Sequence, residues 1–281
     1  MFGAHLSIAG GLHNALLDAE KYGMDTVQVF TKNQQQWKCK PLEEESISLW
    51  DQHRTRIKFK YTVSHDSYLI NLASPDPALR KKSVDLFAEE LRRCVVLGIP
   101  YLVTHPGAHM GEGEEKGLKR VAKSLDEVHR CVKGNGVVTC LEITAGQGSS
   151  LGYRLEHLAR IIELVKAPER VAVCLDTAHL FAAGYDFRGK KFGGFMKELE
   201  KTVGSKRVKV WHLNDSKKDL GSRVDRHDHI GRGKIGLEGF RPIVREKAFA
   251  GIPKILETPK EKDEKGRDWD AVNLETLRGL M

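Results

Sequence analysis

Short apolar segments rich in β-branched residues alternate with amphipathic segments of helical length along the whole chain. Strands that alternate with helices pair in parallel through right-handed crossovers, and eight such units fit a closed (β/α)8 barrel better than an open sheet. The length of 281 residues suits this fold and no linker divides the chain, so we expect one TIM-barrel domain over residues 1–281. The expected strands are Phe2–Leu6, Thr26–Phe30, Tyr61–His65, Tyr101–His105, Val137–Ile143, Val171–Thr177, Val208–Asn214 and Ile252–Glu257; the expected helices include Pro77–Leu97, Gly117–Lys133 and Asp268–Leu280.

Charge and cysteine content narrow the class of protein. A net charge of +8 favours contact with polyanions, although many basic proteins use such charge only to stay soluble. The five cysteines are odd in number and contain no C-x-x-C pair, which favours free thiols in a reducing cytosol over disulfides or a cysteine zinc site. The N-terminal segment lacks a signal-peptide pattern, and no apolar run is long enough to span a membrane. We therefore expect a soluble, cytoplasmic protein.

Ionisable residues stand at or near the carboxyl ends of six consecutive expected strands. A lone His or Asp in such a place is usually a helix N-cap or a hydrogen-bonded loop residue. A barrel, however, brings all strand ends to one rim, and burying so many ionisable groups together is costly unless cations neutralise them. These residues are His65, His105, Glu142, Asp176, His212 and Glu257, and His5 ends the first strand at the same rim.

Two short motifs add candidate metal ligands on the loops of this rim. Asp176-x-x-His179 follows the sixth expected strand, and Asp225-Arg226-His227 follows the seventh. The nine donors exceed the coordination of one ion, so we expect two or three ions. Mixed imidazole and carboxylate donors suit Zn²⁺, with Mn²⁺ or Fe²⁺ as alternatives, whereas Mg²⁺ and Ca²⁺ prefer oxygen donors alone. The complete set is His65, His105, Glu142, Asp176, His179, His212, Asp225, His227 and Glu257.

Three further segments of the rim bear on ligand binding. The segment 231–236 (GRGKIG) matches G-x-G-x-x-G but follows a polar loop, so a dinucleotide site is not expected there. The loop 31–38 (TKNQQQWK) mixes amides, lysines and an indole. The loop 66–71 (DSYLIN) offers apolar side chains that would wedge into a kinked duplex, or would instead pack beneath the loop.

These residues lie in motifs that resemble the endonuclease IV family, also called AP endonuclease family 2 or deoxyribonuclease IV. The resemblance covers nearly the whole chain, and all nine ligand positions occur in order. It implies that Glu142 bridges two zinc ions, one also held by His65 and His105. It also implies the DNA-contacting residues Asn33, Gln35, Trp37, Tyr68, Leu69 and Arg226. The matching segments are GAHLSIAGGL, FTKNQ, HDSYLINLASP, THPGAH, LEITAGQGSSLG, CLDTAHLFAAGYD, SRVDRHDHIG and ILETP.

The resemblance further implies that Asp176, His212 and Glu257 complete the second ion's ligands, and that His179, Asp225 and His227 hold a third ion. The implied reaction is hydrolysis of duplex DNA on the 5′ side of an abasic deoxyribose, leaving a 3′-hydroxyl and a 5′-deoxyribose phosphate. Hydroxide generated by the ions and oriented by Glu142 and Glu257 would attack phosphorus in line. Removal of 3′-blocking groups and action as a monomer are also expected.

Two positions depart from the family pattern. Gln35 stands where the family commonly has an arginine that reaches into DNA, and Arg232 stands where an acidic residue is common. Neither position is a candidate ligand, so both bear on DNA affinity more than on chemistry. Two other classes of protein remain open at this point. One is a sugar isomerase of the xylose isomerase type, which shares the barrel. The other is a DNA-damage-binding protein with structural metal ions.

Overall fold

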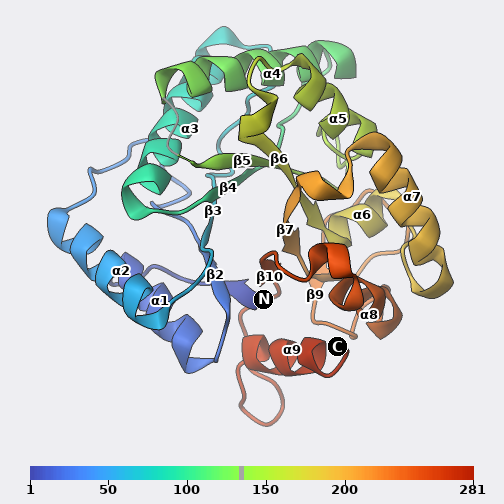
Figure 1. The fold of residues 1–281 in the computed structure, drawn as a ribbon. Coiled ribbons are helices and arrows are strands. Elements are labelled where there is room, and N and C mark those ends of the chain that lie inside the picture. Colours follow the sequence, from blue (N-terminus) through green and yellow to red (C-terminus); the bar gives the residue numbers. More distant parts are fainter. Residues whose placement is uncertain (133–135) are drawn as a thin grey trace.

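Parallel strands close into a barrel in the order β1-β10-β7-β6-β5-β4-β3-β2 (Figure 1). The computed structural model describes residues 1–132 and 136–281. All eight strands of this sheet lie where the sequence predicts them, which confirms the TIM barrel, although each is shorter than expected. They are β1 (Phe2–His5), β2 (Thr26–Val29), β3 (Val63–His65), β4 (Tyr101–Thr104), β5 (Val138–Glu142), β6 (Val171–Asp176), β7 (Val208–His212) and β10 (Lys254–Leu256).

Helices form a ring outside the strands (Figure 1). Helix α3 has the predicted bounds because Pro77 begins it, the Asp76 carboxylate accepts a hydrogen bond from the Ala78 N–H, and Gly98 ends it with φ 63°. The helix expected at Gly117–Lys133 begins three residues earlier, and Lys133 lies outside the described residues. The helices are α1 (Leu12–Lys21), α2 (Glu44–Ile57), α3 (Pro77–Leu97), α4 (Glu114–Cys131), α5 (Leu155–Leu164), α6 (Thr177–Ala183), α7 (Phe192–Thr202), α8 (Leu237–Arg245) and α9 (Trp269–Arg278).

The hydrophobic core has two layers. A small cluster fills the inside of the barrel, and a much larger one lies between the strands and the surrounding helices. Packed side chains thus occupy the barrel interior, so a ligand meets the protein at the rim formed by the strand ends. The inner cluster consists of Val63, Val103, Cys140, Ala172, Cys174, Val210 and Ile255.

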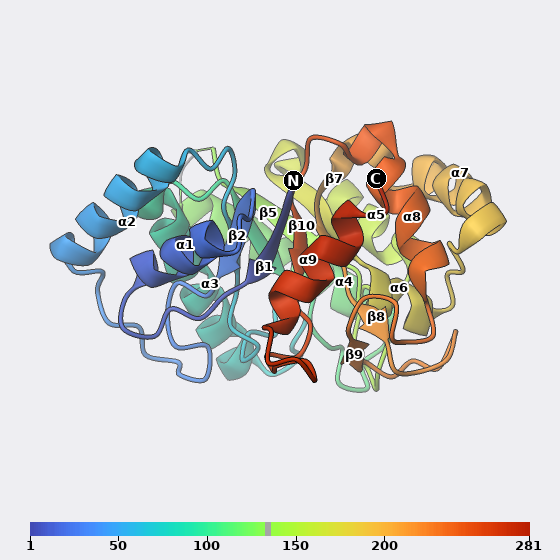
Figure 2. The same cartoon turned by 90° about the horizontal axis from the view of Figure 1, so that it is seen from below.

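A short antiparallel ribbon, which the sequence does not predict, lies beyond the end of β7. It pairs β8 (Asp215–Ser216) with β9 (His227–Asp228). Figure 2 shows this ribbon at the end of the barrel opposite to the N-terminus, which is the rim where the strands end. Two residues per strand are too few for an alternating pattern to be visible in the sequence.

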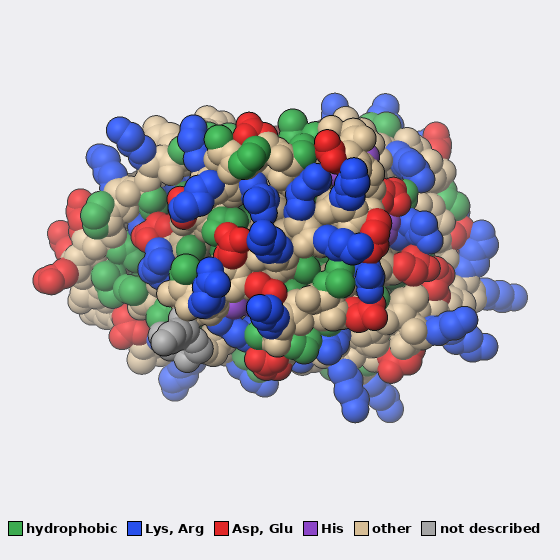
Figure 3. Space-filling model, turned by 90° about the horizontal axis from the view of Figure 1, so that it is seen from above, with side chains coloured by type: hydrophobic (Ala, Val, Ile, Leu, Met, Phe, Trp, Pro, Cys, Tyr) green, Lys and Arg blue, Asp and Glu red, His purple; other side chains and the backbone are tan. Residues whose placement is uncertain are grey.

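Charged side chains are scattered among apolar and polar atoms on the surface drawn in Figure 3. On the face drawn in Figure 3, Lys and Arg side chains lie among Asp and Glu side chains and not in one separate patch. The net positive charge therefore does not locate a binding site on that face by itself. Within the described residues, the longest apolar helical stretches fall short of what crossing a bilayer requires.

Candidate metal centre

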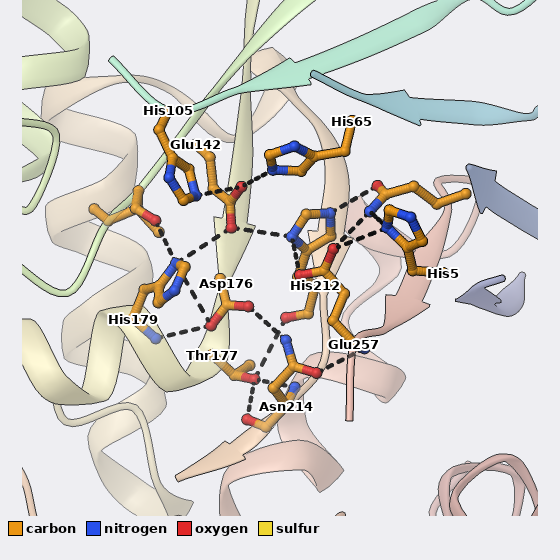
Figure 4. Close-up of polar contacts among 12 residues, drawn as sticks. His5, His65, His105, Glu142, Asp176, Thr177, His179, His212, Asn214 and Glu257 are labelled. Carbon is orange, nitrogen blue, oxygen red and sulfur yellow. Dashed lines mark hydrogen bonds and ion pairs between the residues drawn. The ribbon is translucent and has the colours of Figure 1, made fainter. Parts of the chain in front are cut away.

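Glu142, the last residue of β5, is buried at the centre of the rim with four imidazoles around its carboxylate (Figure 4). Its Oε2 atom lies 3.1 Å from Nε2 of His65 and 3.2 Å from Nε2 of His105. Its Oε1 atom lies 3.0 Å from Nδ1 of His212 and 3.2 Å from Nδ1 of His179. The two carboxylate oxygens therefore face different imidazoles, His65 and His105 on one side and His212 on the other, an arrangement in which one carboxylate can bridge two cations.

A second group of donors lies on the side of the barrel formed by β6, β7 and β10. Single ligand atoms of Glu142, Asp176, His212 and Glu257 all lie within 4.8 Å of one another. Within this group, Nδ1 of His212 is 3.1 Å from Oε2 of Glu257. Three carboxylates and one imidazole at this spacing suit a hard to borderline divalent cation.

A third group involves the loops after β6 and β7. Ligand atoms of Asp176, His179 and His227 lie within 4.8 Å of one another. The two oxygens of Asp225 lie 3.1 Å from Nε2 of His179 and 3.2 Å from Nε2 of His227. The structure thus brings all nine predicted ligand residues to one end of the barrel, in three groups joined by Glu142 and Asp176.

The hydrogen bonds of three histidines suit metal coordination. Each donates from Nδ1 to a backbone carbonyl, and because a carbonyl only accepts, Nδ1 carries the proton of the neutral ring. The Nε2 lone pair then faces a carboxylate oxygen of Glu142 or Asp225 at 3.1–3.2 Å. Two acceptors at this distance repel unless a cation or proton lies between them. The bonds run from His65 to Asp66 O (2.8 Å), from His179 to Ile143 O (2.9 Å) and from His227 to Glu257 O (3.1 Å).

The electrostatics of the rim favour the charged forms of Glu142 and His227. Burial alone would raise the pKa of Glu142, but His212 and His105 hold that pKa well below its usual range. Burial alone would lower the pKa of His227, but Asp176 and Asp225 raise it to about 9. Metal binding here therefore requires the imidazoles to lose protons, as is general for histidine ligands.

Gln28 on β2 is a site residue that the sequence analysis missed. Its amide nitrogen donates to Oε1 of Glu257 at 2.6 Å and to Nδ1 of His5 at 2.9 Å. Its amide oxygen accepts from Nε2 of His212 at 2.9 Å, so the lone pair of His212 Nδ1 points at Glu142 and Glu257. His5, predicted at this rim, therefore contacts the group through Gln28 and Glu257. The available signal was a glutamine between two valines in an expected buried strand (TVQVF).

Asn214, two residues after β7, was also missed. Its amide nitrogen donates to Oδ2 of Asp176 at 2.6 Å, and its amide oxygen accepts from the Glu257 N–H at 2.8 Å. Asp176 also caps α6, since its Oδ1 atom accepts from the His179 N–H at 2.8 Å. Asp176 is thus both a helix N-cap and a candidate metal ligand.

The β3–α3 loop lies beside the metal groups and lines a cavity of about 590 Å³ together with His105, His179 and Asp225. Tyr68 is 58% exposed, and its ring centroid lies 5.2 Å from that of His65. Leu69 is half-buried, whereas Ile70 is buried beneath the loop. Tyr68 and Leu69 are therefore accessible to a ligand at the rim, and Ile70 supports the loop.

The β2–α2 loop exposes Asn33, Gln35 and Trp37, and Arg226 is exposed beside Asp225 on the β7–α8 loop. Asn33 shapes its loop by accepting the Gln35 N–H through Oδ1 at 2.9 Å. Lys32 is turned inward, because its Nζ donates to the Asn33 carbonyl and lies 3.9 Å from Oε1 of Glu90.

The fold and this site define the class of the protein, a TIM barrel with a candidate multinuclear metal centre at its rim. The family model described as a xylose isomerase-like TIM barrel matches residues 16–278. A probable endonuclease 4 of Chloroflexus aurantiacus is 50% identical over 281 residues, which covers 100% of this chain and 98% of that protein. The crystal structure of endonuclease IV from Thermus thermophilus superposes with a TM-score of 0.87 at 35% identity, covering 99% of this chain and 98% of that one. The chain belongs to the endonuclease IV family.

The same barrel occurs in proteins that act on sugars. A D-psicose 3-epimerase from Clostridium cellulolyticum superposes with a TM-score of 0.70 at 16% identity, covering 99% of this chain and 98% of that one. At this identity the likeness concerns the fold alone. The relatives at higher identity favour the endonuclease over the sugar isomerase that the sequence leaves open.

Proposed function

We propose that this protein is a DNA-repair endonuclease that hydrolyses the phosphodiester on the 5′ side of an abasic site. The products would be a 3′-hydroxyl and a 5′-deoxyribose phosphate, and the same site would remove 3′-blocking groups. The observation that carries the proposal is the meeting of three donor groups around Glu142, beside a cavity also lined by Tyr68. Membership of the endonuclease IV family supports the same substrate.

The donor chemistry fits three divalent ions, for which we propose zinc. His65, His105 and Glu142 would hold the first. Glu142 would share the second with Asp176, His212 and Glu257, and the third would bind His179, Asp225 and His227. When bound, the ions would neutralise charge on the phosphate and lower the pKa of a water near phosphorus.

The carboxylates of Glu142 and Glu257 would orient the attacking water. Both face Nδ1 of His212, at 3.0 and 3.1 Å, so the two carboxylates converge on one point of the rim. The hydrogen bond from Gln28 fixes Glu257, and the surrounding imidazoles fix the buried Glu142. Such preorganised groups lower a barrier because little reorganisation accompanies the reaction.

Selection of an abasic site would depend on the loop that carries Tyr68 and Leu69. An abasic nucleotide lacks stacking and pairing, so its extrusion costs less than that of a normal nucleotide. The exposed ring of Tyr68 and the half-buried Leu69 lie where they would support a distorted duplex. The cavity beside them would receive the extruded sugar. The whole chain would act as one catalytic domain and as a monomer.

An end-labelled duplex with one tetrahydrofuran abasic analogue tests the proposal. The protein loaded with zinc should cut that strand immediately 5′ to the analogue, and a polymerase should extend the new 3′ end. Glu142→Gln keeps the side-chain volume but should raise the activation barrier by at least about 4 kcal/mol, which slows incision roughly a thousandfold. Binding without incision would instead favour the DNA-damage-binding protein, and turnover of a ketose in place of DNA would favour the sugar isomerase.

A further inference from the structure

The glycine-rich segment 231–236 encloses a carboxylate of the protein itself. Asp215 on β8 is fully buried, and its Oδ1 atom accepts the N–H groups of Ser216 at 2.8 Å and Ile235 at 2.9 Å. Its Oδ2 atom accepts the N–H groups of Gly231 at 2.9 Å and Gly236 at 3.3 Å. Backbone N–H groups that converge in this way form an anion-binding nest, which in nucleotide-binding proteins takes a phosphate.

The glycines of this segment are required by positive φ angles at Gly231 and Gly236 and by the close approach of the backbone to Asp215 at Gly233. Gly231 and Gly236 have φ angles of 78° and 66°, which side chains rarely adopt. A Cβ atom on Gly233 would lie 2.4 Å from the Ser216 carbonyl oxygen and 2.6 Å from Oδ1 of Asp215. The G-x-G-x-x-G spacing of segment 231–236 thus arises because its backbone folds around the buried carboxylate of Asp215.

The nest lies next to the residues of the third donor group. In the β8–β9 ribbon, Asp215 pairs with Asp228, and Ser216 pairs with His227. The Lys217 N–H donates to the Arg226 carbonyl at 2.9 Å, which extends the contact towards Asp225. The Lys234 N–H donates to the Ser216 carbonyl at 2.7 Å, so the glycine-rich segment and the ligand-bearing segment both rest on β8.

We propose that Asp215 and its glycine-rich nest are a positioning device for the third metal ion's ligands, Asp225 and His227. The ribbon has only two residue pairs, so it needs a further anchor to hold these ligands in place. The four N–H bonds to one buried carboxylate provide that anchor and offset part of the cost of burying its charge. This inference rests on the proposed function, since it concerns one of the three ions proposed above.

Asp215→Asn tests the proposal because it keeps the shape of the side chain. It replaces one accepting oxygen with an NH₂ group, which cannot accept the backbone N–H groups. The protein is loaded with zinc and dialysed against a chelator-buffered zinc solution, and zinc per chain is then measured. We expect Asp215→Asn to retain one ion fewer than the wild type. Its kcat on abasic duplex should fall by about 10- to 100-fold, as for other partners of metal ligands, with KM within about threefold. Excess zinc should restore much of kcat.

Gly233→Ala disturbs the same contact from the other side and should have the same effects. The matched controls are Asp270→Asn, a buried carboxylate paired with Lys260, and Gly251→Ala, whose Cβ would meet nothing within 4 Å. Both controls should retain the wild-type number of ions.

Normal zinc retention by folded Asp215→Asn or Gly233→Ala protein would overturn the positioning role. Loss of all ions together with thermal stability, or failure of both variants to fold, would also overturn it, because Asp215 would then serve global folding. A wild-type protein that retains no zinc, or does not cut abasic duplex, would instead contradict the proposed function.

Discussion

The side-chain amide of Gln28 donates a 2.6 Å hydrogen bond to Oε1 of Glu257, linking β2 to the residue that follows β10. Strand β1 separates these two strands in the sheet, so the bond passes over the carboxyl end of β1 at the rim. The same amide accepts from Nε2 of His212 and thereby turns Nδ1 of that ring towards the candidate metal centre. Gln28 thus fixes two proposed ligands at once.

Gln28→Ala should therefore weaken metal binding. Partners that orient metal ligands typically contribute about 10- to 100-fold in affinity, and we expect a loss in that range. Competition with a chromophoric chelator measures it. Gln35→Ala, which removes an exposed glutamine of the β2–α2 loop, is the control and should leave zinc affinity unchanged. Wild-type zinc affinity in Gln28→Ala would show that Glu257 and His212 are held without the amide.

Tyr68→Ala and Leu69→Ala should weaken binding to abasic duplex more than they slow hydrolysis of a small phosphodiester. The exposed ring of Tyr68 is placed to support distorted DNA, and contacts of this kind contribute about 1–3 kcal/mol. Duplex affinity and turnover of bis(4-nitrophenyl) phosphate measure the two effects. Val96→Ala, which shortens an exposed side chain on α3, should change neither. Equal losses on both substrates would show that the loop mainly supports the metal centre.

Gln35→Arg should tighten binding to abasic duplex and steepen its salt dependence. A guanidinium neutralises phosphate or enters the negative minor groove, which an amide cannot do. Lys32 is turned inward in this loop, so Lys38 and Lys40 are the exposed lysines that already offer charge there. One added phosphate contact should change the log–log salt slope by about one unit. Unchanged affinity at low salt would mean that position 35 does not limit DNA binding.

His129, on α4, should make the protein less stable as the pH falls from 6.5 to 4. Burial, assisted by Arg170, lowers the pKa of His129 from 6.5 to about 4. Between these values the unfolded chain takes up a proton that the folded protein does not. The free energy of unfolding therefore decreases as the pH is lowered, by about 3 kcal/mol in total. His129→Gln should show a smaller fall than the wild type in urea unfolding at pH 7 and pH 4.5. Parallel losses in both proteins would contradict this account.

The sequence predicts the barrel well because strand and helix periods alternate clearly, and because helix α3 carries its own N-cap, proline and terminal glycine. It also predicts that nine candidate ligands meet at one rim, six because a barrel brings strand ends together and three from the two loop motifs that follow β6 and β7. It does not predict Gln28, whose partners are distant in the chain, or the inward turn of Lys32 towards Glu90. The role of segment 231–236 is equally hidden, because its partner Asp215 comes earlier in the chain, on a strand of two residues.

The metal content of catalytically active protein tests the central claim most directly. Protein purified without added metal is first shown to cut abasic duplex, and elemental analysis of the same sample then counts transition-metal ions per chain. Nine nitrogen and oxygen donors in three groups predict between two and three ions, chiefly zinc. A fully active sample with one ion or fewer per chain would contradict the three-group metal centre.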